Sequence, residues 1–239
     1  MTFKNFINIT TGYWIHKLKT LPIGVDLFYD INTRLNYGPL GLVFDVGANE
    51  GQTLKWIKHY QPHSKIISFE PIKSTFVKLS QTASLFHDCI AENIAFGEKA
   101  GNTEVKLFDD LSVLNSLKPE LMNQQPGALK EDIRVECMLD YCKTHNIDKI
   151  DLLKIDTEGY ELNVLQGAGQ LLDVGQVSFI YCEVGFQKSN NRNTSFYEII
   201  SFLELKEYYF YALYQIDSHD WKAGNHLANA LFVHKSIFP

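Results

Sequence analysis

The acidic residues that follow the apolar run 150–155 have the types and spacing of a chemical centre. Asp156, Glu158 and Glu161 stand within six positions of the chain. A carboxylate at the end of a buried strand can remove a proton from a substrate hydroxyl group. Capping of the helix that follows would explain one of these acidic residues, but not three. We therefore interpret Asp156, and after it Glu158, as the candidate catalytic residues.

A second centre is the turn from Asp45 to Thr53, which contains Gly47 and Gly51. Glycine lets the backbone approach a ligand closely, and the start of the following helix can offer free N–H groups to it. The G-x-x-x-G spacing differs from the G-x-G-x-x-G fingerprint of dinucleotide-binding proteins. Asp45 suits a ligand with a positive charge, and S-adenosylmethionine carries both an ammonium and a sulfonium. The alternative is a tight turn with a structural aspartate.

The elements that position these residues follow the pattern of a doubly wound α/β fold. The apolar run 43–46 ends at the glycine turn, and apolar residues at helical spacing follow over 54–60. In such folds a ligand binds beyond the carboxyl ends of the strands. A second unit repeats the pattern, with a strand over 65–70 and a helix over 72–85. Its strand ends in Glu70, the expected partner of a ribose diol.

The rest of the chain predicts further strands and helices with long polar segments between them. A half-exposed strand alternates with period two over 103–108, and the aromatic run 208–216 is strongly β-prone. The segments 109–132 and 185–195 are interpreted as loops that could border a ligand. The other elements are predicted as strands over 89–96, 134–138, 150–156, 177–184 and 230–234, and as helices over 139–144, 160–169 and 196–205.

The composition is that of a soluble globular protein, with 45% apolar and 21% charged residues among 239. A formal net charge of −6 argues against nucleic acid as a partner, because phosphate backbones are bound by basic surfaces. The sequence has no apolar run of 18 residues and no secretory pattern at its start. We therefore expect a cytoplasmic protein that is not an integral membrane protein. The sequence leaves open a homo-oligomer.

Taken together, these segments resemble the FkbM-type family of S-adenosylmethionine-dependent methyltransferases, and the resemblance covers residues 43–235. It rests on a pair of motifs, either of which alone is much less specific: Phe44-Asp45-Val46-Gly47-Ala48-Asn49-Glu50-Gly51 and Leu153-Lys154-Ile155-Asp156-Thr157-Glu158-Gly159-Tyr160-Glu161. Shorter matches are Phe69-Glu70-Pro71, Asn93-Ile94-Ala95, Asn115-Ser116-Leu117 and Val164-Leu165-Gln166-Gly167-Ala168.

The resemblance implies a Rossmann-like class I methyltransferase fold with three α/β/α layers. Its sheet would be seven-stranded and mostly parallel, with an antiparallel last strand. More strand runs are predicted than the seven strands of such a sheet, so one of them is expected to be an insertion. We expect a methyltransferase domain over 43–239 and an N-terminal helical extension over 1–42. The residues implied around the cofactor are Asp45, Gly47, Ala48, Asn49, Gly51 and Thr53 at its methionine part, Glu70 at the ribose, Asn93 and Ala95 at the adenine, and Asp156.

The implied activity is transfer of a methyl group from S-adenosylmethionine to a hydroxyl of a polar small-molecule or glycan acceptor. A sugar or a polyketide-like product is the expected acceptor. Two alternatives stay open. One is a nicotinamide-dependent oxidoreductase on a similar fold. The absence of the third glycine of the dinucleotide-binding fingerprint argues against it. The other is a non-catalytic nucleotide-binding domain, which would have little need for the acidic residues at 156–161.

Four further residues are candidate contacts of the acceptor, because their loops are expected at one edge of the sheet: Ser116, Glu183, His219 and His226. A divalent metal held by carboxylates such as Asp156 and Glu183 could acidify the hydroxyl instead of a base. With oxygen ligands that ion would be Mg²⁺. The sequence gives no ligand count, so a metal site is left open.

Overall fold

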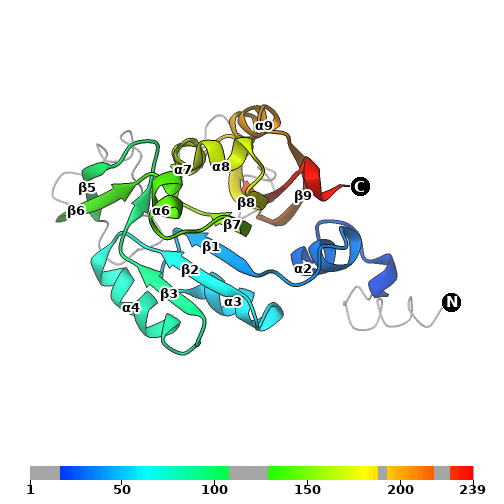
Figure 1. Cartoon of the computed structure of the whole chain (residues 1–239), viewed down its shortest axis with the longest axis horizontal. Helices are drawn as coiled ribbons and strands as arrows, with labels where there is room; N and C mark the ends of the chain where they lie inside the picture. Colours follow the sequence, from blue (N-terminus) through cyan, green and yellow to red (C-terminus); the bar gives the residue numbers. More distant parts are fainter. Residues whose placement is uncertain (1–16, 108–128, 188–192, 218–226, 239) are drawn as a thin grey trace.

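The computed structural model describes residues 17–107, 129–187, 193–217 and 227–238. A seven-stranded sheet lies between helices on both faces, and a three-stranded sheet stands beside it (Figure 1). The main sheet contains β1 (Leu42–Val46), β2 (Lys65–Phe69), β3 (Cys89–Glu92), β7 (Ile150–Ile155), β8 (Val177–Gly185), β9 (Tyr208–Asp217) and β10 (Leu227–His234). The small sheet contains β4 (Ala95–Phe96), β5 (Gly101–Leu107) and β6 (Leu129–Glu136).

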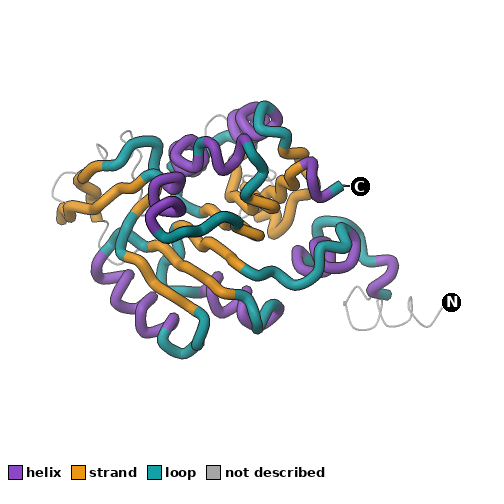
Figure 2. The backbone as a smooth tube through the Cα atoms, in the orientation of Figure 1, coloured by secondary structure: helices purple, strands orange, loops and turns teal. Residues whose placement is uncertain are grey.

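Along the chain a helix lies between successive strands of the main sheet from β1 to β9, as the tube in Figure 2 shows. Near the N-terminus there are three short helical segments, and a short 3₁₀ turn follows the last strand. The helical elements are η1 (Leu18–Thr20), α2 (Leu27–Tyr29), η2 (Asp30–Arg34), α3 (Gln52–Tyr60), α4 (Lys73–Ala83), α6 (Met138–Thr144), α7 (Glu161–Ala168), α8 (Gln170–Asp173), α9 (Phe196–Glu204) and η4 (Lys235–Ile237).

The strand order of the main sheet is β3-β2-β1-β7-β8-β10-β9. Neighbours are parallel except at β10, which runs antiparallel to both β8 and β9. The order reverses between β1 and β7, so the switch point lies where the two acidic motifs end. The predicted fold class is confirmed, including the antiparallel last strand.

Two apolar cores pack against the two faces of this sheet. Because side chains of a strand alternate between faces, Phe44 and Val46 point to one core while Val43 points to the other. Helices α6 to α9 cover the first face, and α2, α3 and α4 cover the second. Figure 1 shows α3 and α4 on the opposite side of the sheet from α6 and α7. The core therefore fixes the positions of the strand ends that carry the site.

The single strand predicted over 89–96 is wrong, because the chain changes sheet within it. β3 pairs with β2, whereas β4 pairs with β6 of the small sheet. The break lies at Asn93, whose side-chain amide donates to the carbonyl oxygens of Glu70 at 2.9 Å and Pro71 at 2.8 Å. At this point side-chain hydrogen bonds take the place of the backbone hydrogen bonds between strands. The pattern of apolar residues in the sequence does not reveal such a change.

One predicted loop is shorter, and one predicted strand longer, than expected. Residues 129–132 of the loop predicted over 109–132 belong to β6, whose residues 129–135 pair antiparallel with β5. The remainder of that segment, 109–128, lies outside the described residues. Likewise β10 begins at Leu227, three residues before the predicted start at Ala230.

Residues 27–40 pack into the second core and are held there by buried carboxylates. Leu27, Phe28, Ile31 and Leu40 are each at most 3% exposed. Asp30 accepts hydrogen bonds from the Gly24 N–H at 2.9 Å and the Tyr214 hydroxyl at 2.7 Å. Asp151 accepts from the Tyr37 hydroxyl and from the N–H groups of Gly41 and Leu42. The division into an extension over 1–42 and a domain over 43–239 stays a prediction.

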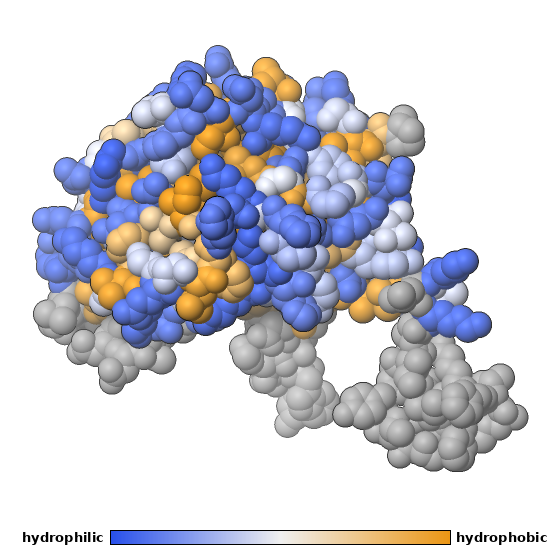
Figure 3. All heavy atoms as spheres, turned by 60° about the horizontal axis from the view of Figure 1, so that its bottom comes forward, coloured by the Kyte–Doolittle hydropathy of each residue, from blue (hydrophilic) through white to orange (hydrophobic). Residues whose placement is uncertain are grey.

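The described surface is mostly hydrophilic on the face seen in Figure 3, with apolar residues in small groups. Within the described ranges, no helix has both the length and the apolar composition needed to cross a membrane. The cytoplasmic location and the oligomeric state stay predictions.

Candidate active site

A row of polar side chains crosses the second face of the sheet near the carboxyl ends of its strands. Strand register places Asp45 of β1 opposite Ser68 of β2 and Lys154 of β7, and it places Lys154 opposite Tyr181 of β8. All four are buried, at 5% exposure or less. Since most of this face is apolar, charges at these positions need one another as partners.

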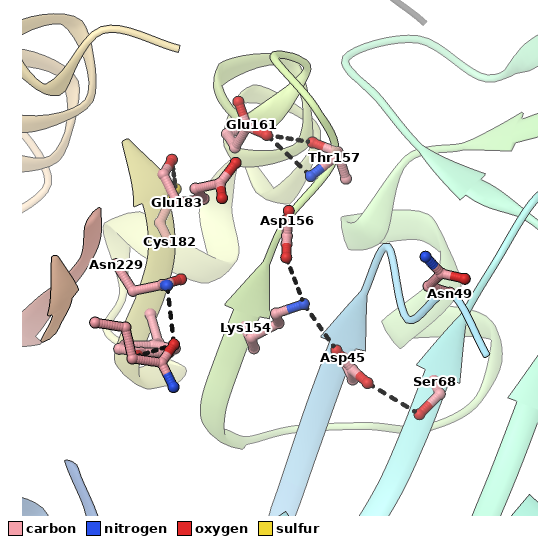
Figure 4. A network of polar contacts seen from close by, with 12 residues as sticks. Asp45, Asn49, Ser68, Lys154, Asp156, Thr157, Glu161, Cys182, Glu183 and Asn229 are labelled. Atoms are coloured by element: carbon pink, nitrogen blue, oxygen red, sulfur yellow. Dashed lines mark hydrogen bonds and ion pairs between the residues drawn. The ribbon is translucent and has the colours of Figure 1, made fainter. Parts of the chain in front are cut away.

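Lys154 joins the two acidic motifs. Its Nζ lies 3.4 Å from Asp45 Oδ1 and 3.3 Å from Asp156 Oδ2. Figure 4 marks both contacts with dashed lines. Burial by itself lowers the pKa of Lys154, but the carboxylates of Asp156 and Asp45 outweigh that effect and raise it. Lys154 is therefore a buried cation between one fully buried carboxylate and one at the surface.

Asp156 stands at the point where β7 ends and the site opens. Its N–H donates to Val46 O at 3.0 Å, and its side chain is 37% exposed. A Cβ atom on Gly47 would lie 1.8 Å from Asp156 O, and Gly47 has φ 76°. The glycine is required because the two strand ends touch through their backbones. The Asp45 and Asp156 motifs are thus one continuous structure.

The glycine turn is fixed from below by β2 and from the side by α4. The N–H groups of Gly47 and Ala48 both donate to Phe69 O at 3.0 Å. Gly51 has φ 90°, and a Cβ atom there would lie 2.8 Å from Thr82 Cγ2 on α4. The absence of a side chain at Gly51 therefore serves helix packing, and its place beside the cofactor stays a prediction. The side chain of Ala48 is buried in the second core.

Glu70 closes the β1 turn from the end of β2. Its carboxylate accepts from the Asn49 N–H at 3.1 Å and from the Ile72 N–H at 3.0 Å. Burial raises the pKa of Glu70 to about 7 despite these two bonds. A carboxylate has about four lone-pair positions, so each oxygen keeps one for a ligand. Asn93 lies beside it through its bonds to Glu70 O and Pro71 O, while Ala95 is buried in the core of the small sheet.

Glu161 has a structural role. It is fully buried, and its Oε1 accepts from the Thr157 N–H at 2.9 Å and the Gly159 N–H at 3.0 Å. Its other oxygen accepts from the N–H and hydroxyl of Thr194. The carboxylate therefore ties the turn before α7 to the segment before α9. Of the three acidic residues Asp156, Glu158 and Glu161, it is therefore Glu161 whose presence is explained by the fold.

Glu183 and Glu158 lie in the electrostatic surroundings of Asp156. Glu158 has φ 53°, a left-handed conformation that few residues with a side chain adopt. Burial, followed by the charges of Asp156 and Glu158, raises the pKa of Glu183 to about 9. Its Oε2 accepts from the side-chain amide of Asn193. Glu183 therefore holds a proton at neutral pH, unlike a surface carboxylate.

This gives a pH dependence that can be measured. The pKa of Glu183 is about 9 in the folded protein and 4.5 in the unfolded chain. Between these two pH values Glu183 keeps its proton in the folded protein but has lost it in the unfolded chain. Stability therefore falls as pH rises from about 4.5 to 9. Between pH 5 and pH 8 the unfolding free energy of the wild type should fall. In Glu183→Gln we expect this fall to be smaller, by on the order of 1–3 kcal/mol. Urea unfolding at both pH values measures it. Glu204→Gln, an exposed position on α9, is the control, and an equal slope in both variants would contradict the assignment.

A pocket of about 210 Å³ opens between α3 and the strands beside Asp156. It lies on the same side as the polar row, and its lining comes from five elements. The residues that line it are Gln52, Thr53 and Trp56 of α3, Lys154 and Asp156 at β7, Tyr181 of β8, Gln215 of β9 and Asn229 of β10. Of the residues predicted around the cofactor, Thr53 and Asp156 are among them.

Six of these residues were not predicted as site residues: Gln52, Trp56, Lys154, Tyr181, Gln215 and Asn229. Lys154 could have been found, because it is the single basic residue in the otherwise apolar end of a buried strand, between Leu153 and Ile155. The others depend on which strands and helices pack together, which one sequence does not show. Of the predicted acceptor contacts, Glu183 pairs in register with Asn229. Ser116, His219 and His226 lie outside the described residues.

The described residues contain no group of three or more His, Cys, Asp or Glu side chains arranged to hold a metal ion. Whether Asp156 and Glu183 take part in binding Mg²⁺ stays a hypothesis.

The chain matches known methyltransferases in sequence. The model of the methyltransferase FkbM domain matches residues 45–211. Methyltransferase sdnD from Sordaria araneosa is 28% identical over 191 residues, which cover 66% of this chain and 72% of that protein. The 2-O-methyltransferase NoeI from Sinorhizobium fredii is 24% identical over 161 residues, covering 63% of this chain and 65% of that protein. The matched part is thus less than two thirds of NoeI.

Among solved structures, the N-terminal domain of human METTL16 in complex with S-adenosylhomocysteine aligns over 96% of this chain and 79% of that one. The identity is 11% and the TM-score 0.48, a level of likeness that carries no functional argument.

The family match and the sequence relatives define the class as S-adenosylmethionine-dependent methyltransferases. The chain belongs to the methyltransferase FkbM domain family. The resemblance noted in the sequence is confirmed, and so is the prediction of an enzyme. The oxidoreductase and the non-catalytic domain are replaced by this assignment.

Proposed function

We propose that this enzyme methylates a hydroxyl oxygen of a polar acceptor and that Asp156 is the base. The observation that carries the proposal is the position of Asp156. Its carboxylate is partly exposed, borders a pocket, and is held by Lys154 next to the Gly47 turn. A positioned carboxylate within reach of a hydroxyl is what O-methylation requires, because the neutral hydroxyl is a weak nucleophile.

The proposed cofactor contacts follow the strand ends. Glu70 is placed to accept from the ribose hydroxyls, since its two bonds to Asn49 and Ile72 leave lone pairs on both oxygens. Asn93 adjoins Glu70 and would border the adenine. Asp45 has no exposed surface. Its contribution is therefore the orientation of Lys154, and direct contact with the methionine amine would require the turn to move.

The cofactor supplies a methyl group that is already activated on a sulfonium. Transfer forms a carbon–oxygen bond, breaks the carbon–sulfur bond with its electron pair going to sulfur, and leaves the hydroxyl proton on the Asp156 carboxylate. Lys154 holds this carboxylate in place, and positioning supplies much of the acceleration. Glu158 is the second candidate for the base, and Glu183, protonated at neutral pH, would donate a hydrogen bond to the acceptor.

The class of acceptor is supported by two independent features. NoeI, a relative, is named as a 2-O-methyltransferase. The pocket beside Asp156 is lined by amides and hydroxyls, which suits a sugar, a glycan or a polyketide-like hydroxyl compound. The negative net charge of −6 favours such an acceptor over nucleic acid.

Calorimetric titration tests the cofactor assignment. We expect heat of binding with S-adenosylmethionine and S-adenosylhomocysteine and none with NAD. Glu70→Gln should weaken S-adenosylhomocysteine roughly 10- to 100-fold, because it removes the charge from hydrogen bonds to ribose. Glu104→Gln, an exposed position on β5, is the control and should leave binding unchanged. NAD binding equal to or stronger than S-adenosylhomocysteine binding would sink the proposal.

A further inference from the structure

The pocket beside Asp156 has the size and lining of a site for a single sugar ring. We propose that it binds one neutral, hydroxylated ring of the acceptor, with Gln215 and Asn229 as the residues that recognise it. The inference rests on the proposed function, which it extends from a general hydroxyl acceptor to a neutral monosaccharide unit. Five features of the pocket support it. They are the backbone conformation of Gln215, the amide groups of Gln215 and Asn229, the Trp56 ring, the pairing of the charged side chains and the pocket volume.

Gln215 is aimed at the pocket by an irregularity in β9. Asn229 of β10 lies opposite Tyr214, whereas Leu227 lies opposite Asp217, so β9 contains one extra residue between these pairs. Gln215 adopts φ 47° at this bulge. Bulges and left-handed backbone at residues other than glycine are costly and tend to occur where a side chain must be redirected. Here the redirected side chain is a pocket residue.

The two amides that line the pocket are already hydrogen-bonded to each other. Gln215 Oε1 accepts from Asn229 Nδ2 at 3.2 Å and faces the Tyr181 hydroxyl at 3.5 Å. Gln215 Nε2 has no partner in the part of the chain that the structure describes, so a donor remains for a ligand. Asn229 Oδ1 is an acceptor next to it. A sugar hydroxyl both donates and accepts, which matches a paired donor and acceptor on one wall.

An aromatic wall completes the pocket. The Trp56 ring packs at 4.8 Å from Phe28 and 6.2 Å from Tyr181, measured between ring centroids. Because Trp56 is held from two sides, it loses little freedom when a ligand packs on it. An aromatic surface beside polar groups is suited to the apolar C–H face of a sugar ring.

The charges that line the pocket cancel. Lys154 and Asp156 form an ion pair with each other, and the other six lining residues are uncharged. Because Lys154 is shared between the Asp156 and Asp45 carboxylates, a ligand carboxylate would find no unpaired cation there, so the pocket favours a neutral ring over an acidic one. The volume of about 210 Å³ lies below the roughly 300–1,000 Å³ of most ligand pockets. It therefore admits one ring and excludes the whole cofactor.

The test is saturation-transfer NMR on the whole 239-residue chain, with and without saturating S-adenosylhomocysteine. The probes are methyl β-D-glucopyranoside and the corresponding glucuronide, which has the same ring with a carboxylate. We expect binding of the glucoside, weaker binding of the glucuronide, and a loss of about fivefold or more in affinity for the glucoside in Gln215→Ala and in Asn229→Ala. Gln81→Ala is the matched control, because this exposed glutamine lines a different groove between α3 and α4.

Three results would overturn the proposal: absence of glucoside binding to the wild type, equal binding of the glucuronide, or an unchanged affinity in Gln215→Ala. If that variant does not fold, Gln215→Glu keeps the side-chain length, removes the Nε2 donor and must weaken the glucoside by a similar factor. Titration of S-adenosylhomocysteine in the same samples separates the two proposals. Glucoside binding without S-adenosylhomocysteine binding would refute the proposed function and leave the sugar site standing.

Discussion

Replacing Asp156 by Asn is expected to lower turnover by roughly 10²–10⁴, the usual contribution of a general base. The amide has nearly the same shape but cannot take up the hydroxyl proton. Lys154 keeps its ion pair with Asp45, at 3.4 Å, so the fold and the Gly47 turn should be preserved. Turnover is measured as S-adenosylhomocysteine released with a hydroxylated acceptor, and cofactor affinity is measured by titration. The affinity should change far less than the turnover.

The matched control for this experiment is Asp148→Asn. Asp148 is exposed and precedes the amino end of β7, the strand whose other end carries Asp156. It should keep wild-type turnover and affinity. If Asp156→Asn lost cofactor binding yet turned over normally at saturation, Asp156 would belong to the cofactor site, and Glu158 would become the first candidate for the base.

The largest effect on stability is expected at Lys154. Lys154→Met keeps most of the side-chain volume but leaves the fully buried Asp45 carboxylate without its cation. Removing one partner of a buried ion pair costs about 3–5 kcal/mol, because the remaining charge is neither paired nor hydrated. Unfolding in urea at neutral pH measures this loss.

Two further variants separate the buried charge from the loss of a lysine. Adding Asp45→Asn to Lys154→Met should recover at least half of the lost stability, because the buried charge is then gone. Lys78→Met breaks an exposed pair with Glu50, in which the lysine is 60% exposed, and should cost at most about 1 kcal/mol. A Lys154→Met loss as small as that of Lys78→Met would show that the Asp45 carboxylate does not depend on this cation.

Sequence periodicity was sufficient for most of the main sheet, because its strands are short apolar runs ended by glycine or acidic residues. β1, β2, β7 and β8 were placed within one or two residues. The errors occur where a side chain replaces a ladder of backbone bonds. At Asn93 two side-chain hydrogen bonds accompany the change of the chain from one sheet to the other. The pattern of apolar residues continues unchanged across this point, so it could not predict the break.

The site was predictable to the extent that it consists of local motifs. Asp156 and Asp45 each follow directly from a strand and turn in the sequence. Their connection through Lys154, and the structural use of Glu161 by Thr194, depend on residues that pair across strands and loops. Asp156 and Glu161 are close in sequence but differ in role. Asp156 is partly exposed at the site, whereas Glu161 is buried with both carboxylate oxygens hydrogen-bonded.

The carboxylates at 30 and 151 also decide how the protein can be divided. The stretch shared with the family begins at Asp45, but Leu27, Phe28, Ile31 and Leu40 fill the core beneath it. A chain trimmed to that shared stretch would lose these four side chains, and Asp151 would lose the Tyr37, Gly41 and Leu42 donors at the amino end of β7. β7 is also the strand that presents Asp156. The segment matched to the family is thus smaller than the piece of polypeptide that must be kept together for β7 to pack in place.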